Sequence, residues 1–230
     1  MKKPTAIAVC LLGVAGVYWL AQAGDLEPPG DPGSTMATLQ QIYDKMDDCT
    51  GGGLCGVPTT GQTECWDAVG TLIDCTGTGQ DGDYQAGASL NPRFTDNGNG
   101  TVTDNLTGLI WLQDADCFGQ REWSNALSDA NTLASDSDTC TPDLSDGSVA
   151  GDWRLPNVKE LQSLIDYGEY GPALPSGHPF SGVLSTYYWS STSNVYYPIN
   201  AWYVNLNIGF VHSSYPKTNT YYVWPVRGGL

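Results

Sequence analysis

Six cysteines follow the first apolar run of this 230-residue chain, and their even number most constrains what the chain can fold into. They are Cys49, Cys55, Cys65, Cys75, Cys117 and Cys140. Behind a secretory signal, an even set of cysteines is typical of disulfides formed outside the cytoplasm. Proximity in sequence favours the pairs Cys49–Cys55, Cys65–Cys75 and Cys117–Cys140, although other pairings stay open. A zinc site is the alternative, and the lack of any Cys-x-x-Cys pair argues against it.

Residues 1–23 are typical of a secretory signal peptide. Lys2 and Lys3 form a basic start, residues 6–20 are an apolar run, and residues 21–23 (Ala-Gln-Ala) form a small-x-small cleavage site. The run is short for a membrane span, which favours cleavage over an uncleaved anchor. We therefore expect a secreted or cell-surface protein that has no membrane attachment after signal cleavage.

The charge balance excludes one class of partner. The formal net charge is −16, and loss of Lys2 and Lys3 with the signal peptide would make it −18. Nucleic acid is therefore not expected as a partner, because phosphate binding needs a surface rich in Lys and Arg.

Enzyme motifs are missing from the sequence. It contains no G-x-S-x-G, no H-E-x-x-H and no Gly-rich phosphate loop, and it has only two His residues. We expect a protein that is not an enzyme, with no catalytic residues. A carboxylate pair for glycoside hydrolysis stays open among the 25 acidic residues, because nothing in the sequence singles out such a pair.

Residues 24–48 are expected to be a Pro/Gly linker followed by a short amphipathic helix. From residue 36 onward, four apolar positions form one helical stripe: Leu39, Ile42, Tyr43 and Met46. The stripe fits a coiled-coil seam that joins several chains into a homo-oligomer, and it equally fits a helix packed on its own domain. Both interpretations stay open.

Residues 49–90 are expected to form a small disulfide-stapled β module. Within it, residues 65–75 are predicted to be a hairpin that turns near Gly70 and is closed by its own disulfide.

The main domain is expected over residues 91–230 and is predicted to be α+β. Helices are predicted at residues 122–134 and 158–167, the second opened by a capping box from Asn157 to Glu160. Strands are predicted at residues 93–96, 101–104, 109–112, 201–208 and 221–227. Alternation in the fourth of these strands puts Trp202, Val204, Leu206 and Ile208 on one face and Tyr203, Asn205 and Asn207 on the other.

Five segments of this domain resemble the C-terminal domain family of Legionella collagen-like protein. They are residues 93–111, Asp152-Trp-Arg-Leu-Pro-Asn-Val-Lys-Glu-Leu161, Tyr188-Trp-Ser-Ser-Thr192, Ala201-Trp-Tyr-Val204 and Val223-Trp-Pro-Val-Arg-Gly228. Together they span roughly residues 91–229. Residues 153–156 are also similar to a segment of formylglycine-generating-enzyme domains, which have a related fold.

The resemblance implies a C-type-lectin-like fold, with two helices beside a twisted antiparallel sheet and long loops. It also implies a secreted protein, often a trimer, that adheres to glycans on a host or other surface.

Aromatic residues crowd the last part of the chain. Aromatic rings stack on the C–H faces of sugars, and Tyr with Asn makes adaptable recognition surfaces. Trp189, Trp202 and Trp224 are expected in the core. The expected ligand-binding residues are Tyr196, Tyr197, Tyr203, Asn205, Asn207, Phe210, His212 and Tyr215. Their ligand would be a glycan or a protein on a host or neighbouring surface, and core packing is the alternative.

No cofactor is expected, and calcium is the one metal that stays open. Residues 96–104 resemble a calcium loop, but Gly98 and Gly100 stand where an EF-hand needs oxygen ligands. The acidic stretches 81–83 and 136–146 could still collect the cation.

The few basic residues of the main domain are expected to be structural. Arg93, Arg154 and Arg227 are predicted to form ion pairs, with Asp152 or Glu160 among their partners. His178 is predicted to pack within a loop.

The sequence thus favours a lectin-like adhesin or surface receptor. The alternative is a structural subunit of an oligomeric or filamentous extracellular assembly, with residues 36–48 and 49–90 as contacts. A hydrolase is the third and least favoured reading.

Overall fold

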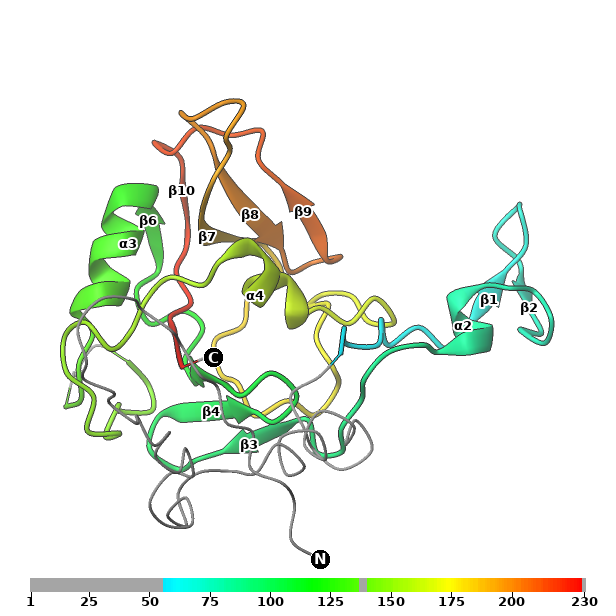
Figure 1. Cartoon of the computed structure of the whole chain (residues 1–230), viewed down its shortest axis with the longest axis horizontal. Coiled ribbons are helices and arrows are strands. Elements are labelled where there is room, and N and C mark those ends of the chain that lie inside the picture. Colours follow the sequence, from blue (N-terminus) through cyan, green and yellow to red (C-terminus); the bar gives the residue numbers. More distant parts are fainter. Residues whose placement is uncertain (1–55, 137–139, 229–230) are drawn as a thin grey trace, which may run out of the picture.

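A computed structural model describes residues 56–136 and 140–228 of the chain (Figure 1). The predicted signal peptide, the 24–48 segment and the pair Cys49–Cys55 lie outside the described residues. The described part has few helices and several sheets, which confirms the predicted α+β class.

Helices in the described residues are α2 (Asp81–Tyr84), α3 (Trp123–Thr132) and α4 (Val158–Ser163). The first strands are β1 (Cys65–Trp66), β2 (Leu72–Ile73), β3 (Phe94–Asp96), β4 (Thr101–Asp104), β5 (Leu109–Leu112) and β6 (Gln120–Glu122). The later strands are β7 (Tyr187–Ser193), β8 (Ala201–Asn205), β9 (Phe210–His212), β10 (Thr220–Tyr222) and β11 (Val226–Gly228).

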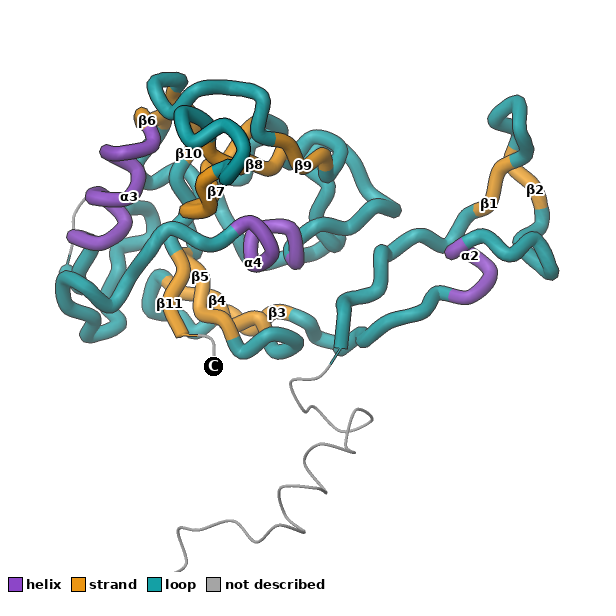
Figure 2. Tube along the Cα trace, turned by 45° about the horizontal axis from the view of Figure 1, so that its top comes forward, coloured by secondary structure: helices purple, strands orange, loops and turns teal. Residues whose placement is uncertain are grey.

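A five-stranded sheet in the order β6-β10-β7-β8-β9 lies between the two longer helices (Figures 1 and 2). Helix α3 packs Ala126 and Ala130 on the face that carries Trp189 and Tyr203. Helix α4 packs on the opposite face, which carries Val204. The period-two alternation predicted for β8 produces these two buried faces.

A second sheet, in the order β11-β5-β4-β3, closes the main core from the other side (Figure 2). Its β3–β4 hairpin confirms the strands predicted at residues 93–96 and 101–104, and the chain turns between them over residues 97–100. Gly100 has a φ of +81°, and a Cβ there would lie 2.7 Å from the Asp143 carbonyl oxygen, so only glycine fits. Asp96 Oδ1 accepts a hydrogen bond from the Gly98 N–H at 2.8 Å, which makes the calcium-like segment a hairpin turn.

Helix α4 starts where its capping box predicts, but it ends early. Asn157 Oδ1 accepts hydrogen bonds from the N–H groups of Lys159 and Glu160, and the Glu160 carboxylate accepts from Asn157 N–H, which confirms the capping box. The predicted extension to residue 167 is wrong. Beyond Ser163 the backbone turns away, because Asp166 N–H donates to the Ala173 carbonyl at 3.0 Å.

Residues 221–227 were predicted to form one strand, and this prediction is wrong. The chain crosses between the two sheets there, with β10 in one and β11 in the other. Pro225 has no N–H for a sheet ladder. The Trp224 indole N–H instead donates to the Leu112 carbonyl of β5 at 2.8 Å and fixes the crossing.

The tryptophan predictions are mostly correct. Trp189 and Trp224 are fully buried, whereas Trp202 is only half-buried. Ile208 was predicted to lie on the inner face of the strand, but β8 ends at Asn205 and Ile208 is exposed in the following turn.

Two disulfides join the predicted partners. Cys117–Cys140 ties the loop before β6 to the loop after α3, and Cys65–Cys75 closes the β1–β2 hairpin. The predicted turn at Gly70 is confirmed, since Gly70 has a φ of +83° between the two strands.

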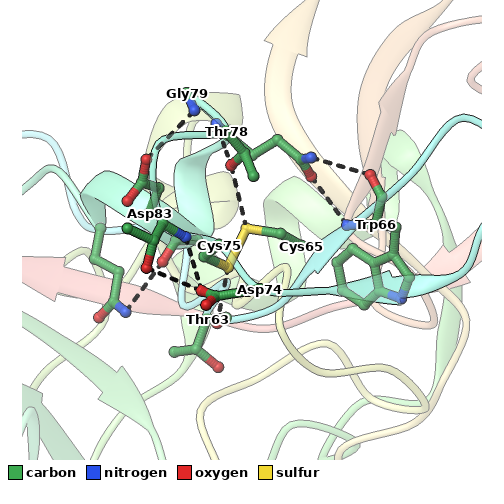
Figure 3. Close-up of a disulfide and its surroundings, with 12 residues drawn as sticks. Thr63, Cys65, Trp66, Asp74, Cys75, Thr78, Gly79 and Asp83 are labelled. Atoms are coloured by element: carbon green, nitrogen blue, oxygen red, sulfur yellow. Dashed lines mark hydrogen bonds between the residues drawn. A yellow bond between two sulfur atoms is a disulfide. The ribbon is translucent and has the colours of Figure 1, made fainter.

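The hairpin belongs to an arm, residues 62–86, that projects away from the main body (Figures 1 and 2). Its centre is the Cys65–Cys75 bond, on which α2 packs Gly82 so closely that a Cβ would lie 2.9 Å from Cys65 Sγ. The Gln80 side chain exchanges two hydrogen bonds with the backbone of Trp66 (Figure 3). The arm thus holds its shape with a disulfide and polar contacts rather than an apolar core.

Candidate functional site

Aromatic side chains cover the part of the five-stranded sheet that α3 leaves open. The cross-strand pairs Tyr187–Asn205, Tyr203–His212 and Asn205–Phe210 place these side chains on one face. We call this surface the tyrosine face; it consists of Tyr187, Tyr203, Asn205, Phe210, His212, Tyr215 and Tyr221.

Tyr203 lies at the centre of the tyrosine face. Its ring centroid is 5.3 Å from that of Tyr187, 5.1 Å from Tyr221 and 5.9 Å from the stacked ring of Tyr215. Tyr203 is itself only 1% exposed, whereas Tyr215 and Phe210 are 44% and 48% exposed. The outer rings therefore present aromatic faces to solvent over a rigid aromatic support.

Hydrogen bonds orient the polar groups at one side of this surface. The Tyr203 hydroxyl lies 2.9 Å from Ser214 Oγ, and the Ser214 N–H donates to His212 Nδ1 at 2.8 Å. Nδ1 is therefore an acceptor, and Nε2 is the nitrogen that carries the proton of the neutral ring. The His212 ring stacks on Phe210, with 5.2 Å between centroids and 16° between planes.

A cleft of about 200 Å³ adjoins the tyrosine face between β7 and β10. These strands are parallel and pair only through Tyr222 and Tyr188, so they diverge beyond that point. Gln120, Thr186, Tyr187, Thr220, Tyr221 and Tyr222 line the cleft. The Thr220 hydroxyl donates to Gln120 Oε1 at 3.2 Å, which places two polar groups beside the aromatic walls.

Two loops beside the sheet are held together by Ser213. The Asn194 amide donates to Ser213 Oγ and the Asn200 amide to the Ser213 carbonyl, each at 2.8 Å. Between these asparagines, Tyr196 and Tyr197 are 77% and 56% exposed and pack against each other.

The structure brings five of the eight predicted ligand residues together and separates the other three. Tyr203, Asn205, Phe210, His212 and Tyr215 belong to the tyrosine face. Asn207 lies in the β8–β9 turn, and Tyr196 and Tyr197 lie in the loop between Asn194 and Asn200.

The prediction that Tyr203 faces solvent is wrong. Alternation correctly placed the Tyr203 side chain on the same face of β8 as Asn205. The rings of Trp189, Tyr215 and Tyr221 pack around the Tyr203 ring on that face and bury it. Tyr187 and Tyr221 were not predicted as site residues. The signal that identifies Tyr187 is its pairing with Asn205, which requires the β7–β8 register.

Burial raises the pKa of two tyrosines of this face. The pKa of Tyr203 is raised, and that of Tyr221 is raised from 10.0 to about 12. The hydrogen bond that the Asn219 side-chain amide donates to the Tyr221 hydroxyl lowers the pKa of Tyr221 and so partly offsets the effect of burial. Both phenols therefore stay neutral at physiological pH and keep their hydroxyl protons.

Alkaline pH is expected to destabilise the protein through Tyr221. Between pH 10 and about 12 the unfolded chain loses this proton before the folded protein does, so the free energy of unfolding falls as the pH rises through this window. Tyr221→Phe should show a decline smaller by roughly 2 kcal/mol. Urea unfolding of both proteins at a series of pH values measures this, and equal declines would contradict the assignment.

The predicted structural role of the arginines is confirmed. The Arg154 guanidinium forms a two-point ion pair with Glu160, Arg93 pairs with Asp104, and Arg227 pairs with Asp146. His178 packs against Phe180, and burial lowers its pKa.

Acidic side chains do not gather into a metal site within the described residues. Over 56–136 and 140–228, no three His, Cys, Asp or Glu side chains lie close enough together to hold an ion. Within the same ranges, no helix has the length and apolar character needed to cross a membrane.

A protein-family model matches most of the main domain. Residues 100–227 match the family described as the Lcl C-terminal domain, and this range contains the whole tyrosine face. The match covers more than half of the chain and excludes the arm. No curated protein shows significant similarity to the chain.

Proposed function

The chain belongs to the Lcl C-terminal domain family, and from this premise we propose that it is a secreted, non-enzymatic binding protein of the bacterial surface. The resemblance to adhesive members of that family supports a lectin-like adhesin or receptor. The signal-like N-terminus and the disulfides support export.

The proposed fold of the binding domain is C-type-lectin-like. Two helices flank a mainly antiparallel sheet, and long loops join the strands after α4. The last strand, β11, pairs with β5 near the start of the domain, so that the two ends of the domain meet in one sheet. These features support the assignment, which otherwise rests on the family resemblance.

The proposed ligand is a glycan, and the tyrosine face is the observation that carries this proposal. The exposed rings of Tyr215 and Phe210 offer flat apolar faces on which a sugar ring can stack. Asn205 beside them, with Gln120 and Thr220 in the adjoining cleft, offer hydrogen bonds to sugar hydroxyl groups.

Charge favours a neutral glycan over a sulfated one. No residue of the tyrosine face or of its cleft is Lys, Arg, Asp or Glu, and the whole chain carries a formal net charge of −16. A polyanion would therefore be repelled at long range and would find no cation at the surface.

Tyr215→Ala is expected to weaken glycan binding by about tenfold, because it removes one of the two exposed stacking rings of the tyrosine face. Phe210→Ala should act in the same direction. The measurement is a glycan array with the purified chain, followed by titration of the best ligand against each variant.

Tyr196→Ala is the matched control, since it removes an exposed tyrosine that lies outside the tyrosine face. Its affinity should equal that of the unchanged protein. Unchanged affinity in both Tyr215→Ala and Phe210→Ala would place the binding surface elsewhere, and an array without any specific signal would turn the search to a protein ligand.

A further inference from the structure

The arm carries an apolar surface that the described residues leave uncovered. Its exposed side chains are Trp66, Val69, Leu72, Ile73 and Tyr84, with Val69 87% and Leu72 59% exposed. None of them belongs to either hydrophobic core of the described residues. A two-stranded hairpin is marginal by itself in water, and an exposed apolar patch of this kind marks an interaction site.

The arm is also uniformly acidic. Residues 62–86 contain Glu64, Asp67, Asp74, Asp81 and Asp83 and no Lys, Arg or His. Two arms would therefore repel each other, and the surface that receives an arm should be apolar with positive charge.

A groove with these properties is present in the same chain, next to the segment that precedes the arm. It has a volume of about 760 Å³ and runs between residues 56–60 and helix α4. Val57, Pro58, Leu109 and Ile165 contribute its apolar lining, and Lys159 and Gln162 stand on α4 beside it. We call it the α4 groove.

Lys159 gives the α4 groove its positive charge. Glu160, the acidic residue of the groove, is neutralised by the Arg154 guanidinium at 2.7 Å, whereas Lys159 forms no ion pair with the described residues. The chain as a whole carries a formal net charge of −16, so a positively charged apolar groove is unusual in it. The Lys159 ammonium and the apolar lining of the groove complement the acidic and apolar surface of the arm.

We propose that the arm of one copy docks in the α4 groove of a second copy, so that copies assemble head to tail. The hairpin points away from its own main body in both views, which favours exchange between copies over closure within one copy (Figures 1 and 2). Arm and groove are different surfaces, so the contact is heterologous and each dimer keeps one free arm and one free groove. Such contacts extend into a filament or close into a ring.

The test uses two variants that each disable one surface. The arm variant, Val69→Ser/Leu72→Ser, removes the apolar contact, and the groove variant, Lys159→Glu/Gln162→Glu, places negative charge where the acidic arm would dock. All four positions are exposed, so both variants should fold, as circular dichroism would verify.

Sedimentation velocity over a concentration series is the measurement. The unchanged chain should form oligomers that grow with concentration, and each variant alone should be monomeric. An equimolar mixture of the variants should give a dimer that grows no further, because only one intact arm and one intact groove remain.

Three results would overturn the proposal. They are a monomeric unchanged chain at every concentration, oligomers of equal mass in both variants, and a mixture that stays monomeric. Oligomers of equal mass would indicate another contact between copies, such as one through residues 36–48.

A photo-crosslinking amino acid at position 69 of the otherwise unchanged chain provides a second test that does not depend on either variant. It should capture the peptide that contains residues 158–163 from another copy. Capture of a different segment would contradict the arm-to-groove contact.

Discussion

Replacing Arg93 with alanine is expected to lower the free energy of unfolding by about 3–5 kcal/mol. Asp104 is completely buried, and Arg93 is its ion-pair partner at 3.1 Å. The Arg93 guanidinium also donates to the Ser163 carbonyl and so joins the β3–β4 hairpin to the end of α4. Removing it leaves a buried carboxylate without its counter-charge, and urea unfolding measures the loss.

Arg121→Ala is the matched control for this prediction. Arg121 forms a similar pair with Asp129, but the two side chains are 40% and 31% exposed. A surface pair of this kind contributes less than about 1 kcal/mol. If the free energy of unfolding falls equally in the two alanine variants, the burial of Asp104 does not make its ion pair more stabilising than a surface pair.

Trp224→Ala is expected to cost about 3–5 kcal/mol, because it removes the largest side chain at the crossing between the sheets. The indole is fully buried and lies edge-on to Phe180 and Trp111, at centroid distances of 4.9 and 5.6 Å. The hydrogen bond from the indole N–H to the Leu112 carbonyl is lost as well. Thermal and chemical unfolding both report the change.

Trp66→Ala removes the same kind of side chain from the arm, where it is 37% exposed, and serves as the control. It should leave the unfolding of the main domain unchanged. A small effect of Trp224→Ala would show that the two sheets do not depend on this crossing for their packing.

Local signals explain what could be predicted from the sequence. The Asn-Gly turn at residues 97–100 specifies the β3–β4 hairpin, and Asn157 with Glu160 specifies the start of α4. Nearness in the chain sufficed for the Cys65–Cys75 pair. Each of these features depends on residues within about one turn or hairpin of each other.

Features that depend on distant segments could not be predicted. The split of residues 221–227 results from competition between two sheets for one segment, and Pro225 is only the place where it occurs. The end of α4 depends on the Ala173 carbonyl, which captures the Asp166 N–H. Neither partner is identifiable from the helix or strand pattern alone.

The candidate site shows the same limit. Alternation in β8 correctly placed Asn205 on the face of Tyr203, whereas Asn207 lies in the β8–β9 turn. Five of the eight predicted residues do lie together. Alternation says nothing about what packs on that face, so the burial of Tyr203 beneath Tyr215 and Tyr221 was missed. The contribution of Tyr187 depends on strand register, which one sequence does not specify.

The anchoring of both neighbouring loops on Ser213 has a consequence for how this protein can change. Asn194 and Asn200 fix the ends of the loop between them, while Val195, Tyr196 and Ile199 point into solvent at 95%, 77% and 71% exposure. The scaffold therefore does not depend on the identity of these three side chains. Foreign peptides could therefore be inserted in this segment, and substitutions there could create new binding specificities without lowering the free energy of unfolding.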